Sequence, residues 1–238
     1  MEYKKKVINS QNDLKIIKRT KERLEVIAKR GPSKKTTIPL KIEEKMAFLC
    51  GTIIGDGHLK KKKLQITLEN TNLKLIDAIK GITKELFNRK FKYTLRKKRK
   101  NKKQSWEIRI DSKAIYNLML IVFKIPSGKK SDIVKIPFEF KRGKNSIKAA
   151  FLIGIIVTEG GYRKRGYGLT TASKQLRDNV VKLLNDLKIK ALKDEWTNKK
   201  YNKKYYGLSF RKEEKKKIIL ACKDKKVRKI IDLCQNLM

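Results

Sequence analysis

The sequence predicts an α+β fold in which two pseudo-symmetric halves, each with the element order αββαββα, pack together through two central helices. Three observations predict this fold. An eleven-residue apolar segment occurs twice, 103 residues apart. Segments that alternate apolar and polar residues follow each copy, as in antiparallel strands with one face on a core and the other in water. Segments with helical apolar periodicity separate and follow these strands.

The internal repeat is the strongest of the three observations. The segment AFLCGTIIGDG at residues 47–57 returns as AFLIGIIVTEG at residues 150–160. At the same offset, Ile66-Thr67 aligns with Leu169-Thr170 and Leu73 with Leu176. At an offset of 100, the strand positions Trp106, Ile108 and Ile110 align with Tyr206, Leu208 and Phe210. The change of offset indicates a loop that is shorter in the second half.

This repeat divides the chain into four parts. Residues 1–38 are predicted to be a basic helical appendage, with a helix over residues 11–29 that Ser10 caps and Gly31-Pro32 ends. Residues 39–124 form the first half, and residues 145–238 form the second. The linker, residues 125–144, contains two prolines and two glycines and is predicted to be a connecting loop.

Each half is expected to follow the same order of elements. In the first half the apolar helix ends at Asp56, strands are predicted over 64–69, 91–96 and 106–110, and an amphipathic helix over about 72–88. In the second half the apolar helix ends at Glu159 and the amphipathic helix covers about 174–188. A strand is also expected near residues 191–197, but the sequence does not define its register.

The charge of the chain indicates a polyanionic partner. It has 64 Lys and Arg against 23 Asp and Glu, a formal net charge of +41. A compact chain with this charge repels itself unless nucleic acid, an anionic membrane or an acidic protein offsets it. A membrane is disfavoured because the charges lie between the apolar positions of strands. The longest apolar run, residues 149–158, is also too short for the ~20 residues that a spanning helix needs.

Two residue counts narrow the location and the chemistry. Three cysteines without CxxC spacing, and an N-terminus without an apolar signal segment, predict an intracellular location (cytoplasm, nucleoid or organelle) rather than secretion. The single histidine, His58, excludes nucleases that need two histidines and makes Ser-His-Asp hydrolysis unsuitable. If the chain is an enzyme, carboxylates, a metal ion and water must carry the reaction.

The two apolar helices carry small residues at a spacing of four, Gly51 and Gly55 in the first copy and Gly154 and Thr158 in the second. Small residues at this spacing allow two helix backbones to approach closely. Such packing would bring Asp56 and Glu159 together at the negative ends of both helix dipoles. Cations must offset this charge, and a divalent metal bound by carboxylates and by the backbone carbonyls of Gly55 and Thr158 would do so.

The segments LCGTIIGDG at 49–57 and LIGIIVTEG at 152–160 resemble the motif of the LAGLIDADG homing endonuclease family, in its single-chain, two-motif and intron-encoded form. The resemblance extends from about Pro39 to the C-terminus. The sequence departs from the motif at Ile54 and Val157, where the family has an acid, and at Cys50 and Ile153, where it has alanine-like residues. The final acidic position is kept in both copies.

This resemblance implies a monomeric, site-specific endonuclease that cuts both strands of a long, weakly palindromic DNA target by metal-dependent hydrolysis. Asp56 and Glu159 would be catalytic and would hold two or more Mg²⁺ ions, with Mn²⁺ as a substitute. The antiparallel sheets would form a saddle over double-stranded DNA. His58 aligns with Gly161, so a histidine role shared by both sites is not expected.

The polar strand faces and the adjacent basic runs are expected to contact DNA, through base edges or phosphates. The candidates are Lys60, Lys62, Gln65, Thr67, Arg96, Lys98, Arg109, Arg163, Arg165, Thr170, Ser209 and Arg211. Lys60 and Arg163, just after the two acids, would either polarise the scissile phosphate or make ordinary backbone contacts.

The N-terminal appendage has two alternative roles. It would either contact flanking DNA through its basic residues or cover the domain as an amphipathic cap. The basic residues are Lys15, Lys18, Arg19, Lys21 and Arg23, and the apolar ones are Leu14, Ile17, Leu24 and Ile27.

Two other functions on the same fold stay open at this stage. The first is an RNA maturase with intron RNA as a partner, and the second is a catalytically silent DNA-binding regulator. A silent regulator is expected to lose one of the two acids, and both are present. An intein is not expected, because the chain begins at Met1 and ends without a flanking splicing segment.

Overall fold

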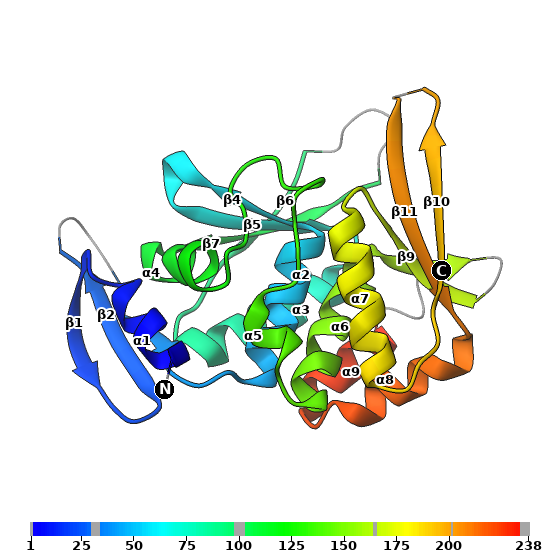
Figure 1. The fold of residues 1–238 in the computed structure, drawn as a ribbon. Coiled ribbons are helices and arrows are strands. Elements are labelled where there is room, and N and C mark those ends of the chain that lie inside the picture. The colour runs from blue at the N-terminus through cyan, green and yellow to red at the C-terminus, as the bar shows by residue number, and fades with distance from the viewer. Residues whose placement is uncertain (1, 30–33, 98–102, 164–165, 201, 234–238) are drawn as a thin grey trace.

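The computed structural model of the protein describes residues 2–29, 34–97, 103–163, 166–200 and 202–233. Two helices run side by side through the middle of the molecule, and a four-stranded antiparallel sheet lies on each side of them (Figure 1). A third, three-stranded sheet stands at the N-terminal end. No helix in the described ranges combines the length and the apolar character that crossing a bilayer requires.

The first half has the predicted element order. Its elements are α2 (Glu44–Gly55), β4 (Gly57–Lys60), β5 (Gln65–Asn70), α3 (Leu73–Phe87), β6 (Tyr93–Leu95), β7 (Trp106–Asp111) and α4 (Lys113–Asn117), which continues as a π-helical turn at Leu118–Val122. The strands form a sheet in the order β4-β5-β7-β6. Its core face carries apolar residues such as Ile66 and Ile108, which are fully buried.

The second half repeats this order and adds one helix. Its elements are α6 (Asn145–Glu159), β8 (Gly160–Arg163), β9 (Gly166–Thr171), α7 (Lys174–Asp186), β10 (Leu192–Asn198), β11 (Lys203–Phe210), α8 (Lys215–Ala221) and α9 (Lys225–Leu233). The sheet order is β10-β11-β9-β8, so equivalent strands occupy equivalent places in the two sheets. The predicted α+β fold with two similar halves is therefore confirmed.

Equivalent caps begin the amphipathic helices of the two halves. The side chain of Asn72 accepts a hydrogen bond from the Leu75 amide at the start of α3, and Ser173 accepts one from the Leu176 amide at the start of α7. A side-chain acceptor at this position satisfies an amide that has no partner within the helix.

The predicted alignment of the two halves was wrong by two residues after the first strand pair. Gly57 pairs with Leu68 and Gly160 with Leu169, so Leu68 is equivalent to Leu169, and the offset is 101. The β4–β5 connection, residues 61–64, is longer by two residues than the β8–β9 connection, residues 164–165. A shift of two residues preserves which side chains face the core, so apolar alternation could not reveal it.

The strand whose register the sequence left undefined is β10, at the edge of its sheet. It pairs with β11 from Leu192 opposite Ser209 to Asn198 opposite Lys203. The β10–β11 hairpin projects from the body of the molecule (Figure 1), and all β10 residues except Asn198 are exposed. Because neither face of β10 is buried, its sequence shows no apolar alternation.

The predicted N-terminal helix over residues 11–29 is wrong. A short helix, α1 (Glu2–Asn9), precedes it, and the segment itself forms β1 (Leu14–Arg19) and β2 (Arg23–Ala28), which pair with β3 (Thr36–Pro39). A turn separates the strands, and the Thr20 hydroxyl accepts hydrogen bonds from the Glu22 and Arg23 amides there. Ser10, which was predicted to cap this helix, instead donates a hydrogen bond from its hydroxyl to the Val7 carbonyl oxygen. β-Branched residues in both strands and non-local pairing outweighed the helical pattern.

The linker is only in part the predicted loop. It contains a one-turn helix, α5 (Phe138–Lys141), and buries Val134, Ile136 and Phe140. The Phe140 ring stacks between Phe123 and Phe151, with centroid distances of 5.0 and 5.3 Å. The linker therefore belongs to the core between the halves, and this packing fixes the position of the residues before α5.

Candidate active site

The two central helices touch through their small residues. A Cβ atom on Gly51 would overlap the carbonyl oxygen of Phe151 and lie 3.1 Å from the Cα of Gly154. A Cβ atom on Gly55 would overlap the hydroxyl of Thr158 and lie 3.2 Å from Cγ of Glu159. The C-terminal ends of α2 and α6 are thus in direct contact.

This contact places the two acidic residues at the same end of the helix pair. Asp56 is the residue that follows α2, and Glu159 is the last residue of α6. Both lie where the unpaired carbonyl groups of a helix make its end negative. The arrangement therefore concentrates negative charge at one point between the halves.

Asn70, at the end of β5, holds the carboxylate of Asp56. Its side-chain amide donates to Oδ2 of Asp56 at 2.6 Å, and its own side-chain oxygen accepts from the Asn72 amide at 2.9 Å. In the second half Thr171 occupies the equivalent place and accepts from the Ser173 amide at 3.1 Å. The two acids therefore differ in their surroundings. No pattern in the sequence pointed to Asn70, because its partner lies on another element.

Lys130, from the linker, places a positive charge at the same point. Its ammonium group donates to the carbonyl oxygens of Ile53, Ile54 and Gly55, the last two at 2.6 and 3.1 Å. A cation at this position offsets the negative end of α2. The carbonyl of Gly55, which the sequence suggested as a metal ligand, accepts a hydrogen bond from Lys130 in this structure. The sequence did not identify Lys130 either, since it lies 74 residues beyond Asp56.

Burial disfavours the charged form of all three ionisable groups at the site. Burial raises the pKa of Asp56 to about 6, although Asn70 and Lys130 act to lower it. The pKa of Glu159 is also raised, first by desolvation at the helix end and then by the charge of Asp56. Burial lowers the pKa of Lys130 to about 8 against the attraction of both acids.

The site fits a hard divalent metal ion. Its donors are two carboxylates beside backbone carbonyl groups, and oxygen is the ligand atom that Mg²⁺ and Ca²⁺ prefer. The described residues contain no cluster of three or more His, Cys, Asp or Glu that could hold an ion alone. A metal here would be held by few protein ligands, with its other positions available for water or a phosphate oxygen.

The raised pKa of Asp56 predicts that Asp56→Asn stabilises the metal-free protein. An aspartate with an ordinary pKa of 3.8 when unfolded and about 6 when folded makes folding less favourable as the pH rises through this window. Above pH 6 the penalty is about 3 kcal/mol. The variant should therefore unfold at higher denaturant concentration than wild type at about pH 8 in EDTA, and the gain should vanish near pH 4.

Asp132→Asn is the matched control for this measurement. The pKa of Asp132 is lowered through its contact with Lys203, so its removal should slightly destabilise the protein at pH 8. Loss of stability in both variants would contradict the assignment of Asp56 as an unfavourably buried acid.

Several predicted DNA contacts share the polar face of the first sheet. Strand register places Thr67 between His58 and Arg109, and Gln65 opposite Asp111. Gln65 and Thr67 are buried, and the Gln65 amide donates to the Asp111 carboxylate. These two residues are thus less accessible to DNA than the alternation suggested, because neighbouring side chains on the same face cover them.

The arginines of this face, exposed Arg109 and half-buried Arg96, are both paired. Arg109 donates to Glu107 at 2.6 Å, and Arg96 lies 3.6 Å from Glu107 and 3.8 Å from Glu69. Glu107 itself is buried, so two cations enclose one carboxylate on the polar face. This pairing leaves the face basic and limits the freedom of both arginine side chains.

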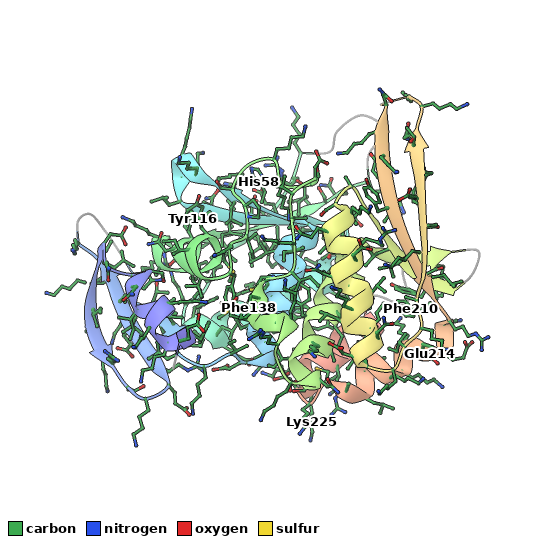
Figure 2. All side chains as sticks on the ribbon, viewed as in Figure 1. His58, Tyr116, Phe138, Phe210, Glu214 and Lys225 are labelled. Atoms are coloured by element: carbon green, nitrogen blue, oxygen red, sulfur yellow. The ribbon has the colours of Figure 1, made fainter. Side chains whose placement is uncertain are left out.

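The remaining predicted contacts are distributed around this site. Lys62 is exposed and Lys60 half-buried on the β4–β5 hairpin, and Arg163 ends β8. Thr170 and Ser209 share the polar face of the second sheet, where Ser209 is buried, and Arg211 is exposed just beyond β11. Lys98 and Arg165 lie outside the described residues. Many side chains that end in nitrogen extend outward along the edges of the molecule (Figure 2).

Both halves of the chain match one protein-family model. The model of the LAGLIDADG-like domain matches residues 43–120 and 146–231. The chain is 30% identical over 198 residues to the replication factor C small subunit of Methanocaldococcus jannaschii, covering 81% of this chain and 10% of that protein. It is 29% identical over 176 residues to an A-type ATP synthase subunit of Pyrococcus abyssi, covering 73% of this chain and 16% of that protein. The chain thus spans only a small part of these relatives.

Solved structures share the fold. The homing endonuclease I-DmoI, in complex with DNA and manganese, is 20% identical with a TM-score of 0.54, and the match covers 75% of this chain and 95% of that one. I-DmoI was also solved with DNA and calcium. Full-length DUF199/WhiA from Thermatoga maritima is 15% identical with a TM-score of 0.53, covering 82% of this chain and 61% of that one.

Proposed function

The chain belongs to the family of LAGLIDADG-like domains, with both repeats on one polypeptide, and we propose that it is a site-specific double-strand DNA endonuclease that uses divalent metal ions. The observation that carries the proposal is the pair of acids, Asp56 and Glu159, at the touching ends of α2 and α6. The raised pKa of each acid supports a site whose charge is completed by cations.

We propose a role for each of four residues. Asp56 and Glu159 would hold the metal ions, with Mg²⁺ as the expected ion and Mn²⁺ as a substitute. Such ions activate a water molecule and offset charge on the departing oxygen when bound. Asn70 orients the Asp56 carboxylate, and Lys130 supplies a fixed positive charge beside both acids. No side-chain general base is required, which agrees with the presence of only one histidine in the chain.

Double-stranded DNA is the partner that the charge and the relatives support. The net charge of +41 suits the phosphate backbone. I-DmoI, which shares the fold, has been solved in complex with DNA. The fold alone does not carry the proposal of cleavage, because DUF199/WhiA shares it to the same extent. The presence of both acids where the two helices touch is what favours an enzyme over a catalytically silent binder.

The curated relatives favour the interpretation that segments like this chain move between genes. Sequences similar to this chain occupy about a tenth of one archaeal protein and about a sixth of another protein with an unrelated name. An endonuclease that cuts a vacant site in a host gene would promote such movement.

Cleavage of a plasmid library with randomised inserts tests the proposed function. In Mg²⁺ the protein should linearise a small subset of plasmids, and sequencing their ends should define one long, weakly palindromic target. Ca²⁺ should support binding without cleavage. Cleavage that continues at full rate in EDTA, or ends scattered without a common sequence, would refute a metal-dependent, site-specific enzyme.

Lys130→Met is expected to lower the cleavage rate by about tenfold or more, because it removes the only cation that the described structure places on the α2 end. Since the pKa of Lys130 is about 8, the wild-type profile of kcat/KM against pH should fall above pH 8. The variant should cleave DNA slowly, and its kcat/KM should not decrease above pH 8.

Lys129→Met is the matched control, since Lys129 is exposed and adjacent in sequence. It should keep the wild-type rate and pH profile. A Lys130→Met enzyme with an unchanged alkaline limb would show that Lys130 acts on folding rather than on the site.

A further inference from the structure

The N-terminal sheet of β1, β2 and β3 is an addition to the family fold. It ends at Pro39, before residue 43, where the match to the family model begins. Within the described ranges the second half has no sheet in the corresponding place. The sheet is thus present on one side of the molecule only, at the far left in Figure 1.

This sheet is attached at the outer end of the first four-stranded sheet. Asn70 contacts Asp56, so the opposite end of β5, where Gln65 pairs with Asp111, is the end farthest from the acids. The two ends are about 17 Å apart at ~3.3 Å per residue. A surface depression next to Asp111 is lined by Leu14 of β1 and Ala28 of β2.

Polar contacts fix the sheet in this position. The Asp13 carboxylate pairs with Lys113 and accepts from the Asn117 amide at 3.1 Å. The hydroxyl of Thr36, on β3, lies 3.3 Å from that of Ser112, just after β7. The N-terminal sheet is therefore held beside the end of the first sheet that is farthest from the acids.

In the N-terminal unit, residues 1–38, every acidic side chain is paired with a described residue, whereas several basic side chains are not. Each acidic residue among residues 1–38 already has an ion pair, and the pairs are Glu2–Lys6, Asp13–Lys113, Glu22–Lys41 and Glu25–Lys35. Four exposed cations on β1 and its turn have no ion pair with a described residue, and we call them the β1 cations: Lys15, Lys18, Arg19 and Lys21. Lys4, Lys5, Lys29 and Lys34 also lack an ion pair with a described residue, but the β1 cations are the four that lie together on one edge strand and its turn.

Strand β1 also lacks packing on either face beyond its first residue. Ile16 and Ile17 are 44% and 46% exposed, and a bulge between Ile16 and Lys18 distorts the edge. Lysines and a bulge at an edge strand discourage pairing with another strand. A second protein strand is therefore a poor partner for this edge, whereas a polyanion matches its charge.

We propose that the β1 cations form a second DNA-contact surface, which binds the phosphate backbone of the duplex that flanks the target on the first-half side. This proposal rests on the proposed function, because the target defines where the flank begins. It makes the footprint asymmetric: the protein should contact DNA farther from the cleavage site on one side than on the other.

Binding to duplexes with defined flanks tests the proposal. The probes are the target selected from the randomised library, trimmed to its ends, and the same target extended by about 12 base pairs, roughly one helical turn, on either side. In Ca²⁺, the wild-type protein should bind the probe with the first-half flank several-fold more tightly than the trimmed probe. The second-half flank should add little.

The variant K15Q/K18Q/R19Q/K21Q should abolish the gain from the first-half flank and leave the affinity for the trimmed target unchanged. The slope of log affinity against log salt on the flanked probe should fall by about 0.9 for each phosphate that the variant no longer neutralises. A matched control, K84Q/K223Q/K225Q/K229Q, removes four exposed lysines near the N-terminal end of α2, away from the acids. Lys225 lies at the opposite edge of the view from His58 in Figure 2. This control should keep the flank effect.

The outcomes separate this proposal from the proposed function. Failure of the wild-type protein to select any duplex target would refute both. Selection of a target with no flank effect, or a variant that weakens all probes equally, would overturn the proposal for β1 alone. An effect confined to double-stranded RNA of the same sequence would assign the strand to RNA and would also overturn it.

Discussion

Asp56→Asn and Glu159→Gln should each abolish double-strand cleavage while DNA binding stays largely intact. Each change keeps the shape of the side chain and removes one of the two charges that would hold metal ions between α2 and α6. We expect the rate to fall by at least about three orders of magnitude, which corresponds to about 4 kcal/mol of transition-state stabilisation. The measurement is single-turnover cleavage of the selected target in Mg²⁺, beside binding in Ca²⁺.

Glu69→Gln is the matched control for these variants. Glu69 lines the same surface cavity as Asp56, but its carboxylate accepts a hydrogen bond from Ser105 rather than lying at a helix end. This variant should cut within a few-fold of the wild-type rate. Wild-type cleavage of both strands by Asp56→Asn or Glu159→Gln would show that the two acids are not the active site.

Gly51→Ala and Gly154→Ala should give the largest losses of stability among single substitutions in the helix pair. The new methyl group on Gly51 would overlap the Phe151 carbonyl, and that on Gly154 would overlap the Phe48 carbonyl. Backbone cannot move aside as a flexible side chain can, so the helices must separate. We expect a loss of about 3 kcal/mol or more, a large part of the 5–15 kcal/mol that usually stabilises a folded chain.

Gly81→Ala provides the opposite result in the same protein. Gly81 lies inside α3, and a Cβ atom there would meet nothing within 4 Å. Alanine should stabilise this helix by about 0.5–1 kcal/mol, because it restricts the unfolded chain more than glycine does. Urea denaturation of the three variants measures both effects. Equal stability of Gly51→Ala and Gly81→Ala would contradict the close helix contact.

The local periodicity of apolar and polar residues was enough to predict most of the helices and strands. Both amphipathic helices lie within two residues of their expected bounds, as α3 (Leu73–Phe87) and α7 (Lys174–Asp186). The alternating segments became β5 and β7, because their apolar residues Ile66, Leu68, Ile108 and Ile110 all face the core. Where neither face is buried, as in β10, the pattern failed to define the strand. Where a strand pair formed through a turn at Thr20, it was mistaken for a helix.

For the candidate site, too, some features follow from the sequence and others only from the tertiary structure. The sequence alone determined that two apolar helices with small faces each end in an acid, since a repeated motif and its spacing are properties of the chain itself. Only the tertiary structure decided what surrounds those acids: Asn70 on Asp56, Lys130 on the end of α2, and an N-terminal sheet at one outer edge. These contacts join residues distant in sequence, and strand alternation of period two does not specify register or partners.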